Sequence, residues 1–75
     1  MDISKYEIEI KRHALIRAME RGVAPDMIEA TIMGGCFEFF GKDYIRFSRR
    51  YRKYDVICVG QVLPTIIKII TIEIK

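Results

Sequence analysis

Several residue types are scarce in this sequence, and each shortage excludes a class of protein. The 75 residues include no Trp, two Cys and a single His. Two thiols and one imidazole cannot supply the four ligands of a structural zinc site without carboxylates, and no ligand pair falls at the spacing of a metal motif. A Gly-rich phosphate loop and a nucleophile elbow are also missing. We therefore expect no metal, no cofactor and no covalent nucleophile.

Long apolar segments are also lacking. Residues 65–72 form the longest apolar run, but Lys68 interrupts it, and the run is far shorter than the ~20 residues of a membrane helix. Residues 1–6 contain no apolar segment of signal-peptide length. We therefore predict a cytoplasmic protein without membrane contact, in which Cys36 and Cys58 are buried, reduced thiols.

Amide side chains are rare as well. The chain has no Asn and one Gln, against fourteen Ile. This bias against thermolabile residues is typical of proteins from thermophiles. In such an organism a disulfide between Cys36 and Cys58 is an alternative to two free thiols.

The residues that are present predict one α+β domain spanning residues 1–75. Residues 6–10 alternate between polar and apolar side chains, which indicates a short first strand. Residues 11–21 change to helical spacing, with Ala14, Leu15, Ala18 and Met19 on the apolar side and Gly22 as the stop. Pro25 is well placed to begin a second helix, which Gly34 and Gly35 would end.

The second half of the chain predicts strands only. Residues 36–40, 44–50, 54–62 and 65–74 are rich in Ile, Val, Tyr and Phe and are separated by short connections. Connections of this length suit hairpins, so we expect a four-stranded, twisted antiparallel meander. The last strand is apolar on both faces, which favours a central position under the helices.

The first helix carries the most suggestive group of polar residues. At about 100° per residue, His13, Arg17 and Arg21 lie within an arc of about 80° on its exposed side. Metal-independent RNA cleavage needs a group that moves protons near neutral pH and fixed positive charge on the phosphate. The alternative interpretation of this ridge is an ordinary solvated helix face, with Arg21 stabilising the helix C-terminus.

A second basic region lies in the strands, within a chain of net charge +3. Tyr44, Arg46, Ser48 and Arg50 share one face of the predicted strand 44–50, which offers a ring and cations to nucleic acid. Five basic residues fall within positions 46–53, Arg52 and Lys53 among them. Such clusters serve anionic partners, nucleic acid first. The alternative is a solvated hairpin tip.

The segment HALIRAMERGV, residues 13–23, followed by a helix and four strands, resembles a family of small uncharacterised domains with a RelE-like toxin fold. Members of the family also have a Tyr-x-Arg-like strand and a Thr in the last strand, and Tyr44-Ile45-Arg46 and Thr71 resemble these two features. The chain departs from the family at Ala24, where members have a Ser or Thr N-cap. The resemblance implies a β-α-α-β-β-β-β order and a relative of metal-independent ribonuclease toxins, with RNA as substrate and an antitoxin as protein partner.

The leading hypothesis is therefore a toxin-like, metal-independent endoribonuclease. His13 would be general acid or base, Arg17 and Arg46 would hold the scissile phosphate, and Thr71 would contact it from the last strand. The remaining candidates, which would bind the flanking RNA, are Arg21, Tyr44, Arg50, Arg52 and Lys53.

Two other classes of protein fit the same residues. One is a non-catalytic module that grips nucleic acid or an acidic protein with the cluster at residues 46–53, so that His13 is incidental. The other is an interaction protein whose apolar sheet edge or helix ridge docks an antitoxin or a second copy of the chain as a homodimer.

Overall fold

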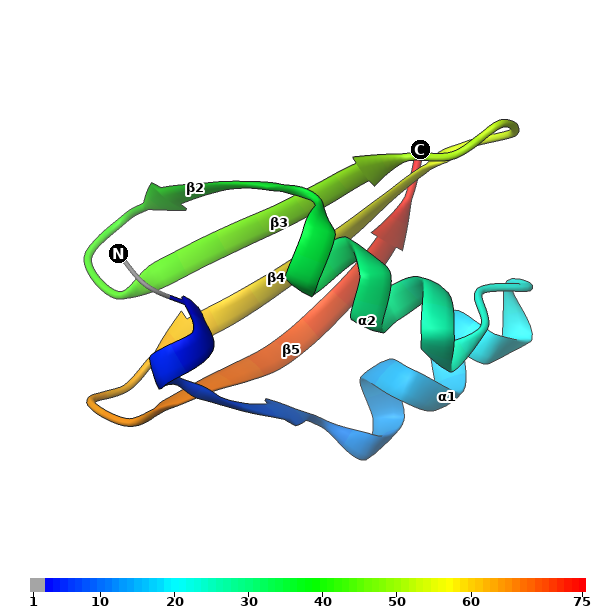
Figure 1. Cartoon of the computed structure of the whole chain (residues 1–75). Coiled ribbons are helices and arrows are strands. Elements are labelled where there is room, and N and C mark those ends of the chain that lie inside the picture. The colour runs from blue at the N-terminus through cyan, green and yellow to red at the C-terminus, as the bar shows by residue number, and fades with distance from the viewer. Residues whose placement is uncertain (1–2) are drawn as a thin grey trace.

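The computed structural model describes residues 3–75, and in it two helices lie on one face of a five-stranded sheet (Figure 1). The elements in chain order are the 3₁₀ turn Ile3–Lys5, β1 (Glu7–Ile10), α1 (Arg12–Glu20), α2 (Pro25–Gly34), β2 (Cys36–Phe40), β3 (Tyr44–Arg50), β4 (Asp55–Val62) and β5 (Ile66–Ile74). The α+β class, the order of elements and the ends of the strands agree with the sequence predictions to within one residue.

The sheet has the order β1-β5-β4-β3-β2. Strands β2 to β5 form the predicted antiparallel meander. The sheet nevertheless has five strands rather than four, because β1 joins it and pairs in parallel with β5, from Glu7 opposite Ile66 to Ile10 opposite Ile69. The alternation in residues 6–10 indicates a strand but carries no information about its partner. β5 is consequently central over this length, as predicted.

The end of α1 is built by the Arg-Gly-Val sequence. Gly22 has φ +87°, a left-handed conformation that favours glycine. Its N–H donates to the Met19 carbonyl at 3.0 Å, and the N–H of Val23 donates to the Ala18 carbonyl at 2.9 Å. These two bonds form a Schellman motif. Because Val23 is buried, the motif anchors the end of α1 that carries Arg21.

The core lies between the helices and one face of the sheet. Ala14 and Ala18 of α1 are buried as predicted, whereas Met19 is wrong as a core residue, since it is 52% exposed. α1 packs beside β5 and α2 covers β3 and β4 (Figure 1), so none of the described elements covers the side of α1 that carries Met19. The largest fully buried side chains are Phe47, Ile28, Ile45, Ile67 and Ile69.

The two faces of the sheet explain the state of the cysteines. Cys58 is fully buried in the core, and burial raises the pKa of its thiol from 9.0 to about 12. Cys36 is exposed, so the prediction of a buried thiol is wrong for this residue. It lies opposite Ser48 on β3, on the face away from the helices, whereas Cys58 lies opposite the core residue Phe47. Both thiols are free.

Candidate functional site

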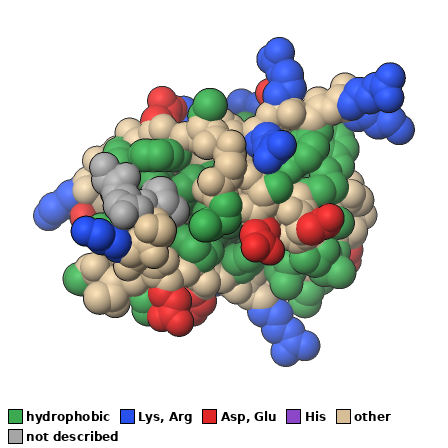
Figure 2. Space-filling view, in the orientation of Figure 1, with side chains coloured by type: hydrophobic (Ala, Val, Ile, Leu, Met, Phe, Trp, Pro, Cys, Tyr) green, Lys and Arg blue, Asp and Glu red, His purple; other side chains and the backbone are tan. Residues whose placement is uncertain are grey.

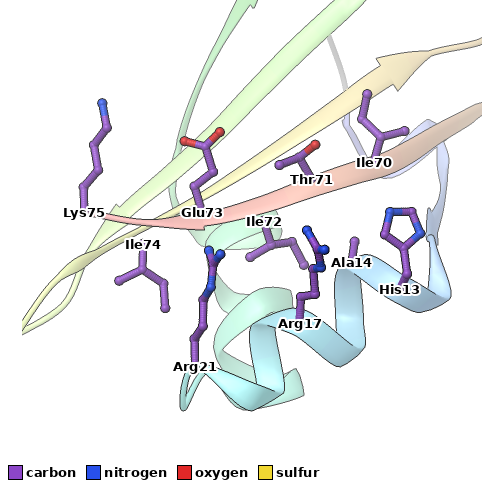
Figure 3. Close-up of a pocket in the computed structure, with 10 residues that line it drawn as sticks. All are labelled: His13, Ala14, Arg17, Arg21, Ile70, Thr71, Ile72, Glu73, Ile74 and Lys75. Carbon is purple, nitrogen blue, oxygen red and sulfur yellow. The ribbon is translucent and has the colours of Figure 1, made fainter.

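A pocket of about 460 Å³ lies between α1 and β5. It exists because β1 ends early: Lys11 donates its N–H to the Ile69 carbonyl at 3.0 Å, after which the chain leaves the sheet and forms α1. Among the described residues, no strand pairs with this edge of β5 beyond Ile69. Figure 3 shows α1 running alongside the free edge. The pocket is lined by His13, Ala14, Arg17, Arg21 and residues 70–75.

The pocket brings together four of the predicted site residues. His13, Arg17 and Arg21 point from α1 toward β5, whereas Thr71 projects from the side of β5 away from α1 (Figure 3), and all four line the pocket. All four are exposed. Within residues 3–75 the salt bridges join Arg46 to Glu38 and Arg50 to Asp55, so neither guanidinium of the ridge is neutralised by a carboxylate. The ridge therefore offers two free cations and one imidazole to an anion.

A β-bulge decides which β5 side chains reach the pocket. The register shifts between Val59 and Gly60, because Val59 lies opposite Thr71 and Gly60 lies opposite Ile69, which leaves Ile70 as the extra residue. Uninterrupted alternation after the buried Ile69 would turn Thr71 into the core. The bulge instead turns it to the open face.

Two charged residues of this pocket, Glu73 and Lys75, are not among the predicted site residues. Both follow Thr71 at intervals of two residues and project from the same side of β5 (Figure 3). Their alternation with apolar residues was a usable signal, but only the position of α1 identifies this part of β5 as a pocket wall. Glu73 adds a carboxylate that can exchange a proton, and Lys75 adds a further cation.

Backbone groups also line the pocket. Asp55 and Lys75 exchange both backbone hydrogen bonds, at 2.8 and 3.0 Å. In an antiparallel pair the hydrogen-bonding direction alternates along the strand, so Thr71 and Glu73 also bond toward β4. The N–H and C=O groups of Ile72 and Ile74 therefore point toward α1. A phosphate in the pocket would meet amide donors as well as guanidinium groups.

Arg46 lies outside this pocket. It shares the open face with Thr71, because both are opposite Val59 on the intervening strand, and two strand spacings separate their backbones by roughly 10 Å. Its guanidinium forms a salt bridge with Glu38 and lies 5.9 Å from the centre of the Phe40 ring. The expected clamp of Arg17 and Arg46 on one phosphate is thus not assembled in this structure.

The other predicted nucleic-acid contacts lie farther along the open face. Tyr44 stacks on Phe40, with ring centres 5.6 Å apart, as part of a small aromatic group with Arg46 above it. Arg50 pairs with Asp55 at 3.4 Å.

Arg52 and Lys53 are exposed in the turn between β3 and β4. Figure 2 shows basic side chains on this protruding tip, at the upper right. The basic cluster does not act as one patch, because Arg49 turns to the helix side, where it lies 5.6 Å from the Tyr51 ring centre.

Comparison with protein-family models, with curated proteins and with solved structures finds no match for this chain. No helix among residues 3–75 is long and apolar enough to cross a membrane. In the same residues, no three side chains of His, Cys, Asp or Glu gather closely enough to hold a metal ion.

Proposed function

We propose that this protein is a toxin-like, metal-independent endoribonuclease whose catalytic site is the pocket between α1 and β5. The observation that carries the proposal is the meeting of the chain's one imidazole, two unpaired guanidinium groups and the Thr71 hydroxyl in one open pocket. Cytoplasmic RNA is the substrate class that fits, and an antitoxin is the protein partner that the RelE-like resemblance implies.

The reaction would be attack of a ribose 2′-oxygen on the adjacent phosphorus. A base takes the 2′-hydroxyl proton, the bond between phosphorus and the 5′-oxygen breaks, and an acid gives a proton to that leaving oxygen. The products are a 2′,3′-cyclic phosphate and a free 5′-hydroxyl. His13 would perform one proton transfer, since imidazole exchanges protons near neutral pH, and Glu73 is the carboxylate available for the other.

The remaining pocket residues would stabilise charge. The phosphodiester already bears one negative charge on its non-bridging oxygens, and a second develops there as the 2′-oxygen attacks. Preorganised cations lower the free energy of that state. Arg17, between His13 and Arg21 on α1, is best placed for this task. Thr71 and the outward amide of Ile72 would donate hydrogen bonds to the same oxygens.

The rest of the open face would hold the flanking strand. The stacked rings of Phe40 and Tyr44 offer a platform for an unpaired base, which prefers an aromatic surface. Arg50, Arg52 and Lys53 lie at the end of the sheet that also carries Lys75, because Asp55 pairs with Lys75. They would follow the phosphate backbone beyond the pocket.

The test is cleavage of mixed RNA by purified protein in EDTA, with products resolved by gel and their ends assayed for cyclic phosphate. Wild type and Arg12→Ala, which changes an exposed α1 residue outside the pocket, should cleave. His13→Ala should cleave at least about 10²-fold more slowly, while keeping the wild-type circular dichroism spectrum. Equal cleavage by wild type and His13→Ala would refute the assignment.

A second candidate is a nucleic-acid-binding module without catalysis. It is favoured by the position of Tyr44, Arg46, Arg52 and Lys53 outside the pocket. RNA binding that weakens steeply with salt, without strand scission under any of the conditions above, would identify this function.

A further inference from the structure

Within residues 3–75, no strand pairs with the edge of the sheet opposite β1, which is β2. All five residues of β2 are exposed, and their sequence is Cys-Phe-Glu-Phe-Phe. Native edge strands are normally protected by Lys, Pro, a bulge or a covering segment. β2 contains neither Lys nor Pro. Its register with β3 is regular, without a bulge. Its one charge, Glu38, is neutralised by Arg46.

The hydrogen-bonding groups of this edge can be assigned from the register. Val62 donates its N–H to the Asp43 carbonyl at 2.7 Å, so the odd-numbered residues of β3 bond toward β4. Its even-numbered residues therefore bond toward β2, and their partners there are the even-numbered residues of β2. The N–H and C=O groups of Phe37 and Phe39 consequently point out of the sheet, with no strand to receive them among the described residues.

We propose that two copies of this chain pair through β2, antiparallel, around a two-fold axis at Glu38. In this register Phe37 lies opposite Phe39 of the second copy and exchanges both backbone hydrogen bonds with it, and the same pair repeats across the axis. All outward groups of Phe37 and Phe39 in both copies are then satisfied. The result is one continuous sheet of ten strands, twice the five in each copy.

The side chains favour a second copy as the occupant over another extended segment. Phe37 and Phe39 are 43% and 52% exposed on the helix side of the sheet, and the two-fold register sets aromatic rings opposite one another, a favourable cross-strand pair. On the open face the register sets Glu38 opposite Glu38 of the second copy, a like-charge pair whose repulsion is offset by the Arg46 that each carboxylate keeps as its partner. A second copy supplies this spacing of rings, because it presents the same strand.

The pairing is independent of the proposed ribonuclease function. β2 lies at the edge farthest from β1, so a second copy there leaves the pocket between α1 and β5 uncovered. The pairing also places the open face of one copy next to the open face of the other on the same side of the continuous sheet.

The first experiment is the oligomeric state of the full chain by sedimentation equilibrium. Wild type should be a dimer. Phe39→Lys should weaken the dimer by on the order of tenfold or more, because the change occurs twice in a symmetric interface and removes both ring pairs. The matched control is Met19→Lys, since Met19 on α1 is also 52% exposed; it should leave the dimer unchanged.

Circular dichroism and thermal unfolding of Phe39→Lys would show that the variant folds. A wild-type chain that stays monomeric at its highest soluble concentration would overturn the proposal. So would a dimer that withstands Phe39→Lys.

The second experiment tests the register, in a Cys36→Ser background. Residues at position 38 face each other as a non-hydrogen-bonded pair, with Cα atoms about 4.5 Å apart, which a disulfide can span. Glu38→Cys should therefore form a covalent dimer under mild oxidation. Phe40→Cys should not, because residue 40 lies opposite residue 36 of the second copy. Cross-linking by Phe40→Cys and not by Glu38→Cys would refute the two-fold register.

Discussion

The two edges of this sheet differ in nearly every property that decides what an edge does. Along β5 a helix lies beside the free strand, a bulge turns Thr71 outward, and His13, Arg17 and Arg21 surround the unpaired backbone. Along β2 the strand is regular, apolar and uncovered. The positive charge and the adjacent α1 favour binding of an anion at the free edge of β5 and hinder pairing with another strand. Among residues 3–75 no helix covers the edge of β2, and its one charge is paired with Arg46, so this edge is suited to strand pairing.

The largest effect is expected at the charged edge. His13→Ala should reduce RNA cleavage between about 10²- and 10⁴-fold, the range that general acid–base catalysis contributes. Initial rates of wild type and variant on one labelled RNA measure the ratio. Arg12→Ala serves as the control on the same helix. If Phe39→Lys reduced the rate of RNA cleavage as much as His13→Ala does, the two edges would not have separate roles.

The two faces of the sheet can be compared through the thiols. Cys36 is exposed, whereas burial raises the pKa of Cys58 to about 12. At neutral pH that shift lowers the thiolate fraction of Cys58 roughly a thousandfold. Alkylation followed by mass spectrometry should label Cys36 rapidly and Cys58 only after unfolding. Rapid labelling of both thiols in native buffer would contradict the burial of Cys58.

The same pKa shift gives stability a pH dependence with a defined sign. The folded chain holds the Cys58 proton more tightly than the unfolded chain does, so this contribution to the free energy of unfolding is complete below pH 9 and is lost as pH rises toward 12. Urea unfolding of wild type and Cys58→Ala at pH 7 and pH 10 measures it. The wild type should lose more stability than Cys58→Ala between the two values.

The start of the β2 edge depends on one glycine. A Cβ on Gly35 would lie 2.4 Å from the Ser48 carbonyl oxygen and 2.5 Å from that of Thr31. Gly35→Ala should therefore destabilise the fold by about 1–3 kcal/mol, the usual cost of overpacking. Gly34→Ala is the matched control, since its Cβ meets only the end of the Arg49 side chain at 3.2 Å. Urea unfolding measures the stability of both variants. Equal free energies of unfolding would contradict the close approach of the Ser48 and Thr31 carbonyl oxygens to Gly35.

The smallest effect is expected at the hairpin tip. Replacing Arg52 and Lys53 by Ala should lower the salt dependence of RNA binding by about 1.4 in log–log slope, the value for two phosphate contacts to a single strand. Arg49→Ala should leave the slope unchanged, because Arg49 contacts the helix side through Tyr51 and Ala30. Binding at several salt concentrations measures both. An unchanged slope in the double variant would remove the tip from the RNA-binding surface.

The agreement between sequence and structure is closest where interactions are local. Pro25, the Gly22 stop and the two-residue alternation in β3 specify α2, the end of α1 and the open face that carries Tyr44, Arg46 and Arg50. The 3.6-residue period also predicts the common ridge of His13, Arg17 and Arg21. These features depend on residues a few positions apart, so a single sequence contains the information needed to predict them.

Tertiary structure alone decided the partner of β1, the role of Glu73 and the position of Arg46 outside the pocket. β1 pairs with a strand nearly sixty positions away, and no local pattern encodes that choice. The bulge at Ile70 reverses the faces of β5 relative to simple alternation, because it lets Ile69 and Ile72 both reach the core. The sequence by itself determined which residues form helices and strands and which side chains share a face. Packing over long separations determined which faces and edges meet, and therefore where a pocket could form.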